Sequence, residues 1–220
     1  MNKTIFILFG APGSGKGFLG ECLKSELVKR EIVSEEQVKY ISTGDLLREE
    51  VASKTALGQE IAQTIASGKL VADTVVDALV GKALQRDGRV MFLDGYPRTS
   101  KQLSYLDTIL RDAGYVVISV KRDTPEKLIL ERVSKRRVCK DCKATHSVDD
   151  GKCPKCGGES IIRKDDAVIE KRLSEYQNNT SGLWDNLWGV SNVMMTVDGC
   201  EDAFKSSETI VNDLKFIGII

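Results

Sequence analysis

A glycine-rich loop with one lysine, residues 10–17 (GAPGSGKG), follows the first apolar run of the chain, residues 4–9. The glycines let the loop turn its backbone N–H groups inward, and the helix expected after Lys16 adds partial positive charge at its N-terminus. The lysine can then reach the terminal phosphates of a nucleotide. Gly17 stands where the general motif has the Ser or Thr that binds magnesium. The spacing therefore predicts a phosphate-binding loop, called the P-loop below, in which other groups hold magnesium.

Four of the six cysteines form two C-x-x-C pairs, and ten residues separate the two pairs. Each pair makes a tight turn that aims two thiolates at one ion, and two such pairs complete the tetrahedral site typical of structural zinc. The ligands would be Cys139, Cys142, Cys153 and Cys156. Four protein ligands leave no open coordination position, so the predicted Zn²⁺ stabilises the fold and takes no part in chemistry. Disulfides suit a cytosolic protein poorly.

A four-cysteine ribbon can also serve as a nucleic-acid-binding module, which would favour clustered basic and aromatic side chains. Residues 139–160 mix lysines with acidic residues and hold no aromatic side chain apart from the imidazole of His146. The whole chain has 32 basic and 32 acidic residues, so its net charge is zero. No nucleic-acid partner is therefore expected. His146 is the one histidine, and we expect it to pack within this segment rather than to bind metal.

The composition indicates one globular core with insertions, since the chain has 220 residues and 41% of them are hydrophobic. No apolar run approaches the roughly 18 residues of a membrane span. The P-loop occupies the place where a secretory signal would have its cleavage site. The sequence therefore predicts a cytoplasmic protein with no membrane association. One histidine against many clustered arginines favours chemistry by charge stabilisation over proton relay.

Short apolar runs at residues 38–41, 90–93, 115–121 and 193–197 alternate with helical patterns. Such alternation predicts an α/β fold in which helices cover a parallel sheet. Residues that directly follow the strands of such a sheet gather at its carboxyl edge, so the P-loop, Thr43, Asp94 and Arg98 are expected to converge there. Residues 139–163 break the alternation, which indicates a small inserted domain.

Six motifs, in order along the chain, are similar to those of adenylate kinases of the bacterial, long-lid, zinc-containing type. They are residues 10–17, 42–48, 68–73, 94–99, 136–139 and 163–166. The resemblance implies a P-loop core of residues 1–41, 72–134 and 167–220, a monophosphate-binding helical flap of residues 42–71, and a hinged, zinc-bound lid of residues 135–166. It also implies a monomer that catalyses the reversible reaction of ATP and AMP to two ADP with Mg²⁺.

The resemblance further implies the roles of single residues, in a reaction that asks mainly for positioning and positive charge. The catalytic set is Lys16, Arg48, Asp94, Arg98, Arg136, Arg163 and Arg172. The ATP site is Gly13, Ser14, Gly15, Lys16, Gly17, Phe18, Arg132, Arg136 and Gly199, with Arg132 against the base. The AMP site is Thr43, Arg48, Val71, Gly95, Arg98, Gln102, Arg163 and Arg172, with Thr43 and Gln102 reading the adenine. Asp94 and Asp45 would orient the waters around magnesium, and Asp165 and Asp166 would pair with lid arginines.

Phe18 and Leu19 depart from the family pattern, which usually has Thr and Gln there, with the Thr helping to bind the α-phosphate of ATP. We expect Phe18 to turn away from the nucleotide and pack toward Cys22, which lies four residues on along the helix and is itself expected in the core. The two cysteine pairs lie closer together than is usual, which implies a smaller lid, and the chain is two residues short before Arg172.

Two further features bear on the assignment. Trp184 and Trp188 are four residues apart on an expected helix, so core packing is predicted for both. UMP/CMP kinases share the P-loop and the arginines but usually have a short lid, and Thr99 together with the long metal-binding lid favours AMP. The remaining alternative is a weakened relative, because Phe18 replaces a phosphate-binding hydroxyl.

Overall fold

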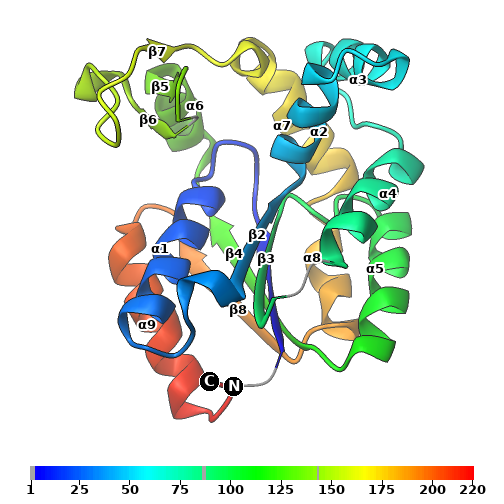
Figure 1. Cartoon of the computed structure of the whole chain (residues 1–220), viewed down its shortest axis with the longest axis vertical. Coiled ribbons are helices and arrows are strands. Elements are labelled where there is room, and N and C mark those ends of the chain that lie inside the picture. The colour runs from blue at the N-terminus through cyan, green and yellow to red at the C-terminus, as the bar shows by residue number, and fades with distance from the viewer. Residues whose placement is uncertain (1–2, 86–87, 143) are drawn as a thin grey trace.

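The computed structural model describes residues 3–85, 88–142 and 144–220, with the backbone alone at positions 112, 164 and 165. At its centre lies a five-stranded sheet with the order β2-β3-β1-β4-β8, in which all neighbours are parallel (Figure 1). The strands are β1 Thr4–Phe9, β2 Val38–Ser42, β3 Val90–Asp94, β4 Val116–Asp123 and β8 Val193–Asp198. The predicted α/β fold and its strands are thus confirmed.

Helices cover both faces of the sheet. The central strand β1 is therefore buried along its whole length, and its side chains alternate between two apolar clusters. Phe6 and Leu8 face the helices α1 (Lys16–Lys29) and α9 (Ala203–Phe216). Ile5 and Ile7 face the other cluster. Its helices are α4 (Asp73–Leu84), α5 (Ser100–Ala113) and α8 (Leu183–Asn186). Figure 1 shows the two groups of helices on opposite sides of the sheet.

The elements above the carboxyl edge of the sheet form two protruding parts (Figure 1). One consists of α2 (Thr43–Ala52) and α3 (Ala56–Ala66). The other is a three-stranded antiparallel sheet of β5 (Arg136–Cys139), β6 (Thr145–Ser147) and β7 (Ser160–Ile161). The helices α6 (Glu126–Lys135) and α7 (Ile169–Asn179) join this small sheet to the core. The short 3₁₀ turns are η1 Glu35–Gln37, η2 Val148–Asp150, η3 Lys164–Val168 and η4 Leu187–Gly189.

The helical protruding part contacts the start of α7 where α3 ends. A Cβ atom added at Gly68 would lie 3.1 Å from Cβ of Lys171 and 3.6 Å from Cβ of Val168. The turn after α3 therefore lies against the start of α7, which returns the chain from the small sheet. This contact brings residues from distant parts of the chain over the edge of the central sheet where the P-loop lies.

The two tryptophans, both predicted to lie in the core, differ in their burial. Trp184 packs on Phe9 with 5.5 Å between ring centroids, but Trp188 is 65% exposed, so the core prediction is wrong for Trp188. The reason is local: α8 ends at Asn186 and continues as the 3₁₀ turn η4. A 3₁₀ turn advances each residue by about 120° rather than 100°, so residues four apart no longer share a face.

Cys22 lies in the core, as expected, and His146 packs within the small sheet. Cys22 is 3% exposed among the side chains of α1, α9 and the sheet. The His146 side chain is 3% exposed. Its Nε2 lies 2.8 Å from the Ser160 hydroxyl, and its Nδ1 lies 2.9 Å from the Ser147 carbonyl oxygen. No helix in the described part of the chain combines the length and the apolar character needed to cross a bilayer.

Candidate active site

The P-loop takes its shape from glycines with left-handed backbone torsions. Gly13 and Gly15 have φ values of 84° and 85°, a region that side chains with a Cβ rarely adopt. A Cβ atom at Gly13 would lie 2.7 Å from a methyl group of Val133, so this glycine is also required for the close approach of α6. The loop ends at Lys16, the first residue of α1, and thus places the helix N-terminus at the carboxyl edge of the sheet.

The Asp94 carboxylate explains why glycine follows the P-loop lysine. A Cβ atom at Gly17 would lie 2.8 Å from Oδ2 of Asp94, so this carboxylate occupies the space that a Ser or Thr side chain would need. Oδ1 of Asp94 lies 4.0 Å from Nζ of Lys16. The Tyr40 hydroxyl donates to the Gly17 carbonyl at 3.1 Å, a contact that the sequence analysis missed because Tyr40 belongs to a different strand. Carboxylate oxygen is the ligand type that Mg²⁺ prefers.

Lys16 lies in a strongly positive environment. Its side chain is 16% exposed. Burial lowers the pKa of Lys16 to about 8; Asp94 raises it, and the charges of Arg98, Arg172 and Arg136 lower it again. The fold therefore brings three of the predicted arginines within electrostatic reach of the P-loop lysine, although they come from three separate segments. This concentration of cations suits a polyphosphate ligand.

The end of β3 and the start of α5 hold Arg98 in place. Nε of Arg98 donates to the Gly95 carbonyl at 2.8 Å, and the backbone N–H of Arg98 donates to Oε1 of Gln102 at 2.7 Å. Nε2 of Gln102 donates to Oδ1 of Asp73 at 2.8 Å. The Thr43 hydroxyl donates to the carbonyls of Asp94 and Gly95 at 3.2 and 3.0 Å. Thr43 and Gln102 are each 2% exposed, so both side chains are engaged with the protein itself.

Arg48 and Val71 come from the helical part above the sheet. Arg48 forms an ion pair with Asp45 one helical turn earlier, and Val71 packs against the cluster that contains Tyr96. Burial alone would raise the pKa of Asp45, but the hydrogen bond and charge of Arg48, a hydrogen bond from Ser42 and the charge of Arg163 hold it below its ordinary value. Arg163 therefore lies close enough to Asp45 to act across the gap between the two protruding parts.

Arg136 and Asp166 form a largely buried ion pair at the base of the small sheet. The Arg136 and Asp166 side chains are 16% and 6% exposed, and Nε of Arg136 donates to Oδ2 of Asp166 at 3.0 Å. A second hydrogen bond joins Nη2 of Arg136 to Oδ1, which makes the pair bidentate. The predicted pairing of Asp166 is confirmed. The Asp165 side chain lies outside the described part of the structure.

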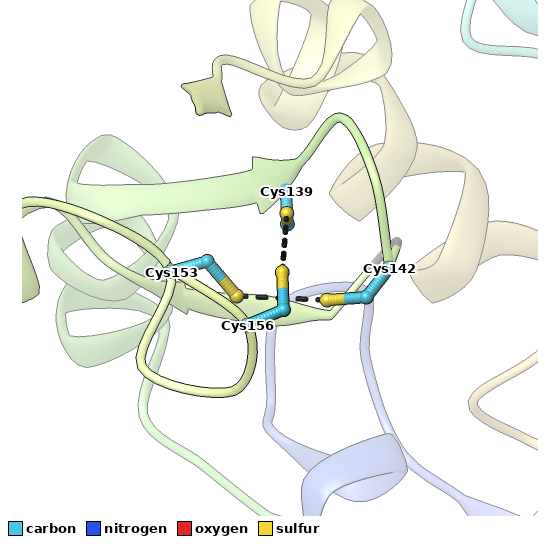
Figure 2. Close-up of side chains that lie close together, drawn as sticks. All are labelled: Cys139, Cys142, Cys153 and Cys156. Atoms are coloured by element: carbon cyan, nitrogen blue, oxygen red, sulfur yellow. Dashed lines mark hydrogen bonds between the residues drawn. The ribbon is translucent and has the colours of Figure 1, made fainter. Parts of the chain in front are cut away.

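The four predicted zinc ligands meet at one point (Figure 2). Their Sγ atoms all lie within 4.8 Å of one another, and the shortest separations are 3.4 Å for Cys139 and Cys156 and 3.5 Å for Cys142 and Cys153. These separations are far longer than the roughly 2.0 Å of a disulfide. They are close to the edge of a tetrahedron with bonds of about 2.3 Å from zinc to sulfur. The donor set therefore fits a tetrahedral, thiolate-bound metal.

Known proteins are similar to this chain over most of its length. The adenylate kinase family model matches residues 8–188. The adenylate kinases of Desulforudis audaxviator and Caldicellulosiruptor bescii are each 34% identical to this chain, over 94% and 97% of it and over 98% of their own lengths. The chain belongs to the adenylate kinase family. The adenylate kinase of Pyrococcus furiosus is 38% identical over 79% of this chain and 79% of its own length. The protein is accordingly a phosphotransferase of the nucleoside monophosphate kinase type.

The prediction that Phe18 packs toward Cys22 is wrong. The Phe18 ring is 55% exposed, and it meets the ring of Phe204 edge-on, with centroids 5.6 Å apart and an interplanar angle of 89°. Phe18 lies in the first turn of α1 and Phe204 in the first turn of α9, and both turns lie at the carboxyl edge of the parallel sheet. The edge-on partner is therefore another exposed aromatic ring rather than the core residue Cys22. Leu19, by contrast, is fully buried among core residues of this side of the sheet.

Two arginines bind the loop after β8, and one of them, Arg132, also binds the P-loop. Arg132 donates through Nη1 to the Ser14 carbonyl at 3.1 Å and through Nη2 to the Gly199 carbonyl at 2.7 Å. Arg122 donates through Nη2 to the same Gly199 carbonyl at 3.3 Å and to the Glu201 carbonyl at 2.8 Å. The sequence analysis missed Arg122 because it lies within a strand and outside every motif. It stands between Lys121 and Asp123 at the charged end of that strand, so its charge gave no signal of burial.

Proposed function

We propose that this enzyme transfers the terminal phosphoryl group of ATP to AMP and that the reaction runs reversibly to two ADP. The observation that carries the proposal is the shared environment of Lys16, Arg98, Arg136 and Arg172 beside Asp94, at the edge of the sheet where the P-loop ends. Phosphoryl transfer needs reactants held in line and positive charge on the equatorial oxygens rather than a covalent or proton-relay step. A site rich in arginine with a single lysine meets that need.

The donor side is assigned to the P-loop. Backbone N–H groups of residues 13–17 would bind the phosphates of ATP, and Lys16 would reach its terminal phosphates as a point charge. Arg132 would lie against the base, since it already joins Ser14 to Gly199. Arg136 would approach the transferring group, with Asp166 fixing the plane of its guanidinium. This account keeps positive charge where negative charge develops in the transition state.

The acceptor side is assigned to the residues around β3 and α2. Arg98 and Arg48 would bind the AMP phosphate, and Arg163 and Arg172 would close on it. Gly95 and Val71 would line the same site. Because the Gln102 amide accepts from the Arg98 backbone and donates to Asp73, we assign it first the task of orienting Arg98. The Thr43 hydroxyl donates to the backbone carbonyls at the end of β3, and Thr43 would hold the edge of the adenine base of AMP beside that backbone.

Magnesium would be held through waters on Asp94 and Asp45. The position of Asp94 against Gly17 supports this, because a carboxylate stands where the general motif has a hydroxyl. Magnesium held there would neutralise part of the negative charge of the phosphates. Asp94 forms an ion pair with Lys16 and would also order the waters around the ion. Asp45, in turn, also pairs with Arg48.

The proposal extends to the organisation of the molecule. Residues 42–71 would act as a monophosphate-binding flap and residues 135–166 as a lid, both hinged on the core of residues 1–41, 72–134 and 167–220. Zinc held by the four cysteines would stiffen a lid that is too small to build an apolar core of its own. Six free cysteines with four in one cluster fit a reducing, cytoplasmic setting, and we propose a monomer.

A coupled assay of ADP formation tests the reaction, with AMP, UMP, CMP and GMP each offered beside ATP. AMP is expected to give the largest kcat/KM, and faster turnover of UMP would refute the proposal in favour of a UMP/CMP kinase. Arg98→Ala should lower kcat/KM with AMP by about a thousandfold, on the scale of a lost charge contact in a site that excludes water. Arg111→Ala is the matched control, because Arg111 is 73% exposed on α5 and pairs with Asp107. A loss below about tenfold for Arg98→Ala would mean that the AMP site is misplaced.

A further inference from the structure

Arg122 is the one buried residue among the arginines and lysines that the structure describes, with 4% exposure. It lies near the end of β4 and points to the face of the sheet covered by α1 and α9, as its near neighbours Ile118 and Val120 do. Basic side chains are almost never fully buried unless they are paired. The position of Arg122 therefore needs an explanation beyond packing.

The guanidinium of Arg122 is incompletely paired. Nη2 donates to the carbonyls of Gly199 and Glu201, but Nε and Nη1 are buried and have no hydrogen-bond partner within the described chain. None of the ion pairs among the described residues involves Arg122, and the charges of Asp202 and Asp198, which favour its charged form, make no hydrogen bond with it among the described contacts. Burial and the charge of Arg132 lower the pKa of Arg122. A buried charge without a counter-ion lowers the stability of a protein.

This cation lies directly against the P-loop. A Cβ atom at Gly15 would be 3.5 Å from Nε of Arg122 and 3.7 Å from Nη1 of Arg132, so two guanidinium groups adjoin the same loop residue. The Ser14 hydroxyl, one residue earlier, is likewise buried without a partner among the described residues. The unpaired Nε of the guanidinium thus lies against the loop whose backbone N–H groups are arranged for phosphate.

We propose that Arg122 is a positioning residue for the donor nucleotide, a buried cation whose counter-ion is the polyphosphate chain held by the P-loop. This inference rests on the proposed function to the extent that a nucleoside triphosphate occupies the P-loop. Bound phosphates place several negative charges on the far side of a thin backbone loop, where little water screens them from the guanidinium. Arg122 would also supply attraction at a P-loop that lacks the hydroxyl replaced by Phe18.

The competing explanation is that Arg122 acts through its two carbonyl partners alone and shapes the Gly199 loop for the base. Inorganic tripolyphosphate separates the two, because it carries the charge of the donor and has no base. The variants are Arg122→Met, which removes the charge at similar length, and Arg122→Lys, which retains it. Arg111→Met, on the exposed face of α5, is the matched control.

Calorimetric titration of the full-length enzyme with tripolyphosphate and with ATP, without added metal, gives the test. Arg122→Met is expected to raise Kd for both ligands about tenfold, while Arg122→Lys and Arg111→Met stay within about threefold of the parent protein. The Tm of ligand-free Arg122→Met should not fall, because loss of an unpaired buried charge offsets two lost hydrogen bonds. Unchanged tripolyphosphate affinity in Arg122→Met overturns the proposal, and a loss confined to ATP assigns Arg122 to the Gly199 loop instead.

If Arg122→Met does not fold, Arg122→Gln replaces it, since Gln keeps a donor for the Gly199 carbonyl and has no charge. A Gln variant with the tripolyphosphate affinity of the parent overturns the proposal. Failure of the proposed function is distinguishable: a preference for UMP over AMP changes the acceptor assignment and leaves these donor-side titrations unaffected.

Discussion

Phe18→Thr introduces a hydroxyl at the position where the family resemblance implies a Thr that helps to bind the α-phosphate of ATP. In this chain the P-loop N–H groups and Lys16 are present, so the substitution adds one donor to an existing phosphate site. A hydrogen bond to a charged group is worth about 1.5–3 kcal/mol. Because about 1.4 kcal/mol corresponds to a factor of ten, ATP should bind roughly tenfold tighter or better.

The cost in stability follows from the surroundings of the ring. Phe18 is 55% exposed, and its one aromatic contact is the edge-on approach to Phe204. Such a pair contributes about 0.5–1.5 kcal/mol beyond burial of area. A loss near 1 kcal/mol lowers Tm by about 2–4 °C in a chain of this size. Loss of a core phenylalanine would cost about 3–5 kcal/mol, so the Tm of the ligand-free protein tests the exposed position directly.

The assay compares Phe18→Thr with Phe18→Val, which has nearly the same shape and no hydroxyl. Titration of each variant with ATP in the presence of magnesium gives Kd, and a thermal melt of the free protein gives Tm. Thr should bind more tightly than Val, and both should melt a few degrees below the parent. Equal gains for Thr and Val would mean that the ring had obstructed the site and that the hydroxyl adds nothing. Weaker binding by both would refute the reasoning, because the ring would then be part of the nucleotide site.

The remaining predictions concern the lid, the ion pair at its base and the P-loop lysine. Metal analysis of the native protein should find one zinc per chain, and its removal by a chelator should lower Tm while the central sheet stays folded by far-UV circular dichroism; less than about half an equivalent with reduced thiols would contradict the site. Asp166→Ala should destabilise the protein by about 3 kcal/mol in urea, since it leaves the Arg136 charge without its partner, and the double variant with Arg136→Met should cost less than the two single changes added. Lys16, whose pKa is about 8, loses its charge above that pH in the free enzyme, so ATP affinity should fall from pH 8 to 10 in the parent and stay flat in Lys16→Met. Because the pKa is lower in the folded than in the unfolded chain, this lysine should make the free protein more stable as pH rises from about 8 toward 10.5, and a decline attributable to Lys16 would contradict the shift.

Local patterns in the chain were sufficient for the sheet, the P-loop and the cysteine cluster. Residues 5–9 are all apolar because both faces of their strand are covered, and that property can be seen in consecutive residues of the sequence. The glycines of the P-loop and the two C-x-x-C pairs are also short-range signals, since each sets a turn within a few residues. The convergence of Lys16, Asp94 and Arg98 followed from the rule that parallel strands end at one edge.

The exposure of side chains and the use of their polar atoms depended on contacts between segments far apart in the chain. Phe18 and Cys22 share a helix, but the Phe18 ring contacts Phe204 because α9 packs alongside α1 and begins at the same edge of the sheet. Gln102 is committed to Asp73 and Arg98, and Arg122 is buried beneath the P-loop. No periodicity in a sequence contains these facts, because burial and hydrogen-bond pairing are properties of the packed elements together. The burial of Arg122, for example, arises when α1, α9 and the loop after β8 close around the end of β4.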